Sequence, residues 1–106
     1  MGRKTVVESE RSAYVVLEGD LDIFRKSEVA SALPDPARVD SVVINCSRAA
    51  YIDSLVLGML VQFRRQFVAA GGDPRALVLM LPREGPIRRT FELTGLTRLF
   101  EIAYSE

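Results

Sequence analysis

A hydroxyl stands beside a carboxylate in the segment Tyr51-Ile52-Asp53-Ser54, which lies between an expected buried strand and a mostly apolar helix. The first turn of a helix has unpaired N–H groups and a partial positive charge, so a hydroxyl or phosphate placed there is held by those donors. In sheets of parallel strands, function usually lies in loops at the carboxyl ends of the strands. The alternative is that Asp53 or Ser54 is an ordinary helix cap.

Two more carboxylates, Asp20 and Asp22, follow another expected strand. If that strand runs parallel to the strand over 41–46, both loops leave the same edge of the sheet. The two carboxylates then approach Asp53 and Ser54. The alternative is that they are solvated loop residues with no role in binding.

The hydrophobic pattern indicates which elements position these residues. Continuous apolar strands that alternate with helices imply parallel strand pairs joined by right-handed crossovers, and we expect strands such as 41–46 to be buried on both faces. The predicted fold is α/β, in one domain over 1–106, with a mixed, mostly parallel sheet of four to five strands covered by three to four helices. Strands are expected at 5–9, 13–18, 41–46, 76–81 and within 100–104, and helices at 24–33, 54–70 and 86–94.

The two long helices each have a predicted buried side. Gly58 stands in the first two turns of the second helix, where Gly costs about 1 kcal/mol relative to Ala. It therefore suggests close packing at that point, or else a tolerated defect. The predicted buried residues are Phe24, Val29, Ala32 and Leu33 in the first helix, and Val56, Met59, Leu60, Phe63 and Phe67 in the second.

The composition excludes several classes of function. The 106 residues include no His and one Cys, and 14 Lys+Arg balance 14 Asp+Glu. Without these side chains there is no His-activated nucleophile, imidazole site or zinc cluster, so we expect no enzyme, cofactor or metal. Zero net charge argues against nucleic-acid binding. No apolar run approaches the ~20 residues that span a bilayer, and no signal-peptide core follows Met1, which predicts a cytoplasmic protein without membrane insertion. Cys46 is expected to be a buried apolar filler.

Several motifs, in this order along the chain, resemble the STAS domain family (sulfate transporter and anti-sigma factor antagonist). The first is a G-x-L-D loop before the first long helix, followed by an apolar strand and a turn like the family's Y-I-D-S-S-G-L-G. The last helix and the tail resemble the family's L-x-x-x-G-L and L-F-x-I patterns. The segments that carry the resemblance are Gly19–Asp22, Val42–Ser47, Tyr51–Ser54, Pro86–Leu96 and Leu99–Ile102.

The resemblance implies a non-enzymatic switch of the anti-sigma factor antagonist type. Such antagonists bind an anti-sigma factor that is itself a serine kinase of the histidine-kinase-like ATPase type, and so release the sigma factor. The kinase phosphorylates the serine after the motif aspartate, here Ser54, and a phosphatase reverses the reaction. A monomer or weak dimer is expected. The implied partner-binding residues are Asp20, Asp22, Asp53, Leu55 and Gly58.

Three positions depart from the family pattern. Leu55 and Val56 replace the usual Ser-Gly after the acceptor, and Asn45 stands where the strand usually has Asp. Larger side chains restrict the backbone more than Gly does, so kinase docking at this turn can differ. Alternatives are therefore a constitutive protein-binding scaffold of a stress-signalling assembly, or the STAS subunit of an ABC-type lipid transport complex.

Overall fold

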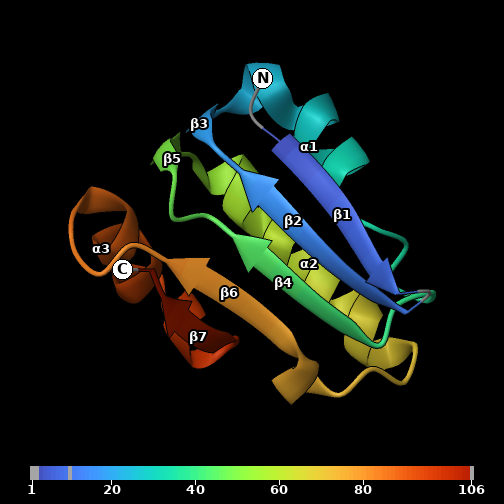
Figure 1. The fold of residues 1–106 in the computed structure, drawn as a ribbon. Helices are drawn as coiled ribbons and strands as arrows, with labels where there is room; N and C mark the ends of the chain where they lie inside the picture. The colour runs from blue at the N-terminus through green and yellow to red at the C-terminus, as the bar shows by residue number, and fades with distance from the viewer. Residues whose placement is uncertain (1–2, 10, 106) are drawn as a thin grey trace.

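A computed structural model describes residues 3–9 and 11–105, and Figure 1 shows their arrangement. Residues 1–2, 10 and 106 lie outside the described residues, so the expectations that include them are not compared there. The strands are β1 (Arg3–Ser9), β2 (Ser12–Leu17), β3 (Gly19–Leu21), β4 (Ser41–Asn45), β5 (Ala49–Ile52), β6 (Leu77–Leu81) and β7 (Glu101–Tyr104). The α-helices are α1 (Lys26–Ala32), α2 (Ser54–Ala69) and α3 (Pro86–Leu93), and the 3₁₀ helices are η1 (Ile23–Arg25), η2 (Pro74–Ala76) and η3 (Leu96–Arg98).

The main sheet has five strands in the order β1-β2-β4-β6-β7. β1 and β2 form an antiparallel hairpin, and the other neighbours are parallel. The prediction of an α/β fold with a mixed, mostly parallel sheet is confirmed. None of the helices within the described residues is both long and apolar enough to cross a membrane.

The helices cover only one face of the main sheet. The parallel strands follow one another in one direction across the sheet, so right-handed crossovers place all the connecting helices on the same side. Figure 1 shows α1 and α2 together behind the strands. Burial alternates along β2 and β6, and Val43 in β4 is only half-buried. The expectation of strands buried on both faces was therefore wrong, because none of the helices in the described part of the chain lies on the second face.

The core lies between the main sheet and this helical layer. α2 contributes most to it, and Phe63 and Phe67 stack with ring centroids 6.4 Å apart. Cys46 is wholly buried, as predicted, and burial raises the pKa of its thiol to about 12. Met59, expected in the core, is only half-buried at its edge.

Two short strands replace the predicted loop and turn around the candidate site. β3 occupies the expected loop after β2, and β5 occupies the stretch before α2; the two pair in parallel as a separate sheet. The chain leaves β2 at Gly19, where φ is +82°, a conformation that disfavours residues with a Cβ. The Gly19 N–H donates to the Arg48 carbonyl at 3.1 Å, which joins the starts of the two short strands.

Candidate functional site

Two strand-to-helix junctions lie side by side where β3 and β5 end. Leu21 is in register with Ile52, and the Asp53 N–H donates to the Leu21 carbonyl at 3.1 Å. Each strand then meets an aspartate that caps the next helix. We call the segment 20–25 the first junction and the segment 51–58 the second junction. The expectation that the two loops leave the same edge of the sheet is confirmed.

Asp53, not Ser54, is the N-cap of α2. Its carboxylate accepts a hydrogen bond from the Val56 N–H at 3.1 Å, and its carbonyl accepts one from the Leu57 N–H at 3.1 Å. Ser54 is the first residue of α2 and is exposed. Within the described residues, no hydrogen bond engages its hydroxyl. The serine oxygen therefore lies free at the positive end of a 16-residue helix.

Asp22 caps the first junction in a similar way. Its carboxylate accepts from the Phe24 N–H at 3.0 Å, and its carbonyl accepts from the Arg25 N–H at 2.9 Å. The Arg25 guanidinium also donates to the backbone carbonyl of Asp20 at 3.1 Å. Asp20 itself is exposed to solvent. The helix that begins here, η1, has only three residues.

Phe24 corrects one of the core predictions. It was expected on the buried side of the first helix, but its side chain is 92% exposed. The helix starts as a 3₁₀ turn, and Phe24 precedes Val29 by five residues, which in an α-helix places the two about 140° apart. That spacing was the signal that could have identified an outward residue. The exposed large apolar side chains of the two junctions, here called the apolar rim, are Ile23, Phe24, Tyr51 and Leu55.

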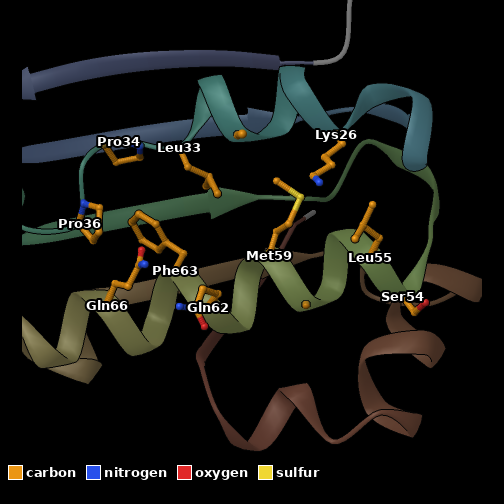
Figure 2. Close-up of a pocket in the computed structure, with 12 residues that line it drawn as sticks. Lys26, Leu33, Pro34, Pro36, Ser54, Leu55, Met59, Gln62, Phe63 and Gln66 are labelled. Carbon is orange, nitrogen blue, oxygen red and sulfur yellow. The ribbon is translucent and has the colours of Figure 1, made fainter.

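Gly58 is exposed, and a Cβ built on it would meet nothing within 4 Å. The prediction that it serves close packing is therefore wrong within this chain. Gly58 and Leu55 instead line a groove of about 610 Å³ between α1 and α2, and Ser54 lies at one end of it (Figure 2). No local sequence pattern indicates this groove, because its walls come from helices and a linker that are far apart in the chain. The other lining residues are Lys26, Ala30, Leu33, Pro34, Pro36, Met59, Gln62, Phe63 and Gln66.

Asn45 is the last residue of β4, and its side chain makes two hydrogen bonds. It is buried, and its carboxamide donates to the Tyr14 hydroxyl at 2.6 Å and accepts from the Ser47 N–H at 2.9 Å. A carboxamide has both a donor and acceptor groups, so both contacts are satisfied without a buried charge. This accounts physically for an amide at a position where the resembling family usually has a carboxylate.

The chemistry at this edge of the sheet is that of a surface hydroxyl among carboxylates and apolar side chains. Asp20, Asp22 and Asp53 carry the negative charge of the junctions. Within the described residues, no group of three or more His, Cys, Asp or Glu could hold a metal ion. The site has the parts of a contact surface that a modification could alter.

Comparison with known proteins agrees with this fold. Among solved structures, the chain is similar to the anti-sigma factor antagonist SpoIIAA in its unphosphorylated form, with a TM-score of 0.76 and 18% sequence identity over 99% of this chain and 89% of that chain. It is also similar to SpoIIAA, described as a Bacillus cell fate determinant, in its phosphorylated form, with a TM-score of 0.67 and 18% identity over 99% of this chain and 92% of that one. At this identity the likeness establishes the fold. The sequence model of the STAS domain matches residues 3–106, and the chain therefore belongs to the STAS domain family.

Proposed function

We propose that this protein is an anti-sigma factor antagonist that binds a serine kinase of the histidine-kinase-like ATPase type and is released when Ser54 is phosphorylated. A phosphatase restores the binding form. The observation that carries the proposal is the exposed, unengaged Ser54 hydroxyl at the first residue of α2, beside the apolar rim. In this proposal the protein is cytoplasmic, the partner kinase catalyses the phosphorylation, and this chain supplies only the acceptor hydroxyl and the contact surface.

A phosphate on Ser54 is compatible with the folded chain. It adds about −1.5 to −2 charges, and the N-terminus of α2 stabilises part of that charge. Because Ser54 is exposed and Asp53 already supplies the cap, the modification breaks no hydrogen bond of the junction. The free protein therefore keeps its structure when it is modified.

The same phosphate opposes binding. It joins three carboxylates, those of Asp20, Asp22 and Asp53, at the surface that meets the partner. A bound partner excludes water from this surface, which strengthens the repulsion between the phosphate and these carboxylates of the same chain, and about 1.4 kcal/mol already weakens affinity tenfold. A partner pocket shaped for a small hydroxyl adds a steric cost. Phosphorylation thus releases the partner by local repulsion.

Incubation with ATP and a serine kinase of the histidine-kinase-like ATPase type from the same organism, followed by mass spectrometry, tests the proposal directly. A phosphate on Ser54 is expected, together with kinase binding that Ser54→Asp weakens at least tenfold and Ser54→Ala preserves. Ser41→Asp is the matched control and should bind normally. Ser41 is exposed at the start of β4, at the opposite end of the parallel strands from Ser54. Equal binding by Ser54→Asp and the unmodified protein would contradict the switch.

A constitutive protein-binding module is the second candidate. It is favoured by Val56, whose side chain is wholly buried in the first turn of α2 where the family often has Gly. A buried Val fixes this turn more firmly than Gly would. Tight kinase binding by a chain whose Ser54 stays unmodified is the result expected from this candidate. Purification with an ABC-type ATPase and its permease in place of a kinase would instead favour the lipid-transport alternative.

A further inference from the structure

The groove between α1 and α2 is long, apolar and open along one side. Figure 2 shows Leu33, Met59 and Phe63 lining it, with Pro34 and Pro36 towards one end and Ser54 at the other. From Ser54 to Gln66 it follows α2 for about 18 Å, at 1.5 Å per residue. This length equals three turns of a second helix laid alongside.

Gly58 lines the groove one helical turn from Ser54 and has no packing role within the chain. Ala at this position would favour the helix by about fivefold in its equilibrium, and no atom lies within 4 Å of where its Cβ would stand. The free space above Gly58 leaves the backbone of this helical turn open to a close approach from outside the chain. The absence of a Cβ therefore leaves room at this point of the groove for a side chain of a bound partner.

The shape of the groove selects the kind of occupant. Pockets for small molecules enclose most of their ligand, whereas this groove has exposed walls at Ala30 and Leu55. An amphipathic helix needs only one face covered, and it places apolar anchors at helical spacing into such a groove. The groove is also continuous with the apolar rim through Leu55, which belongs to both.

The charge of the groove adds a second requirement. Lys26 is the one charged side chain among its lining residues, and Figure 2 shows it at the wall contributed by α1. Among the described side chains, no carboxylate forms an ion pair with Lys26. The other polar lining residues, Gln62 and Gln66, are neutral. An occupant with a carboxylate beside its apolar face matches this pattern.

On the premise of the proposed function, we infer that the α1–α2 groove receives one amphipathic helix of the partner kinase, with an apolar side chain seated over Gly58 and a carboxylate paired with Lys26. Ser54 then lies at the entrance of the groove. A phosphate there meets the acidic side of the incoming helix, which ties the release of the kinase to the modification. The groove thus extends the switch surface along α2.

Binding of the kinase to three variants of this chain, measured by isothermal titration, tests this inference. Gly58→Ala should raise the Tm, because Ala favours the helix, yet weaken binding about tenfold because its methyl group overpacks the interface. Lys26→Glu should weaken binding about tenfold, and a kinase variant with the contacting carboxylate changed to Lys should restore it. Arg98→Glu, an equally exposed charge reversal in η3, should bind normally.

The outcomes separate this inference from the proposed function. If Ser54→Asp weakens binding but Gly58→Ala and Lys26→Glu bind like the unmodified protein, the switch stands and the groove inference is overturned. If the groove variants weaken binding and Ser54→Asp does not, the groove inference stands without the switch. A dimer of this chain in light scattering that Gly58→Ala converts to a monomer would place a second copy in the groove and overturn the inference.

Discussion

The first and second junctions have the same plan but start very different helices. In both, a short parallel strand ends at an aspartate whose carboxylate accepts a backbone N–H two or three residues later. The first junction starts a 3₁₀ helix of three residues, and the second starts an α-helix of 16 residues. The residue after the cap is Ile23 in one and Ser54 in the other.

Under the proposed function, this difference gives the two junctions different roles. A three-residue 3₁₀ turn has little dipole, so the first junction serves to point Phe24 into solvent. The second junction has a full helix behind it, and its N-terminus can stabilise an added negative charge. We therefore regard the first junction as the apolar contact and the second as the part that responds to modification.

The largest effect is expected when the first junction loses its apolar contact. Phe24→Ala should weaken kinase binding by about 2 kcal/mol or more, close to 30-fold, since a large aromatic buried at an interface is a typical hot spot. The free energy of unfolding should change by less than about 0.5 kcal/mol because the ring is 92% exposed. Titration calorimetry and urea denaturation measure the two quantities.

Leu93→Ala is the control for Phe24→Ala. Leu93 is 82% exposed at the end of α3, outside both junctions, so its truncation removes a similar solvated apolar side chain. It should change neither binding nor stability. If the two variants bind equally well, Phe24 is not a contact and the division between the junctions fails.

The next effect concerns the buried thiol of Cys46. Cys46 precedes β5, and its carbonyl accepts from the Ala49 N–H at 3.1 Å. Burial raises the pKa of its thiol from 9.0 to about 12, so the folded chain keeps this proton while the unfolded chain loses it above pH 9. The unfolded state is then favoured as the pH rises. The stability contributed by the neutral thiol is fully present below pH 9 and decreases by about 1.4 kcal/mol per pH unit towards pH 12.

Denaturation of the unmodified chain and of Cys46→Ala at several pH values isolates this contribution. Between pH 8 and pH 10.5 the unmodified chain should lose about 2 kcal/mol relative to Cys46→Ala. The comparison of the two proteins removes the titration of other groups. If the free energy of unfolding changed equally with pH in the two proteins, the Cys46 thiol would not be buried in the folded chain.

The fold was predictable because its signals are local and strong. Each of these signals specifies an element without its neighbours: the apolar runs over 41–46 and 76–81, and the helical period over 54–69. β3 and β5 were not predicted because each has only three or four residues and is stabilised by pairing with the other. The open face of the sheet was missed because residues of β4 and β6 are apolar on both sides.

The candidate site was predictable where the two junctions meet and not beyond them. Asp53 and Ser54 stand where an apolar strand gives way to a helix, and the convergence of Asp20 and Asp22 followed from parallel strands. Whether Asp53 or Ser54 caps α2 depends on backbone dihedral angles, which cannot be read from the sequence. The groove depends on how α1 and the linker after it lie against α2, which is a matter of tertiary packing.

The smallest effect compares the two caps directly. Asp53→Ala should lower the free energy of unfolding by about 1 kcal/mol, because the first turn of a long helix loses its acceptor. Asp22→Ala should cost only a few tenths of that, since its hydrogen bond is exposed and the helix it starts has three residues. Urea denaturation of both variants at pH 7 measures the difference.

The same two variants separate capping from switching. Asp53→Ala leaves the Ser54 hydroxyl in place but loosens the turn that presents it, so phosphorylation should slow more than it does in Asp22→Ala. Asp53→Asn retains an acceptor for the Val56 N–H and removes the charge, so it should restore most of the stability. If Asp22→Ala destabilised the chain as much as Asp53→Ala, the two junctions would be equivalent supports, and the length of the helix behind each would not explain their different roles.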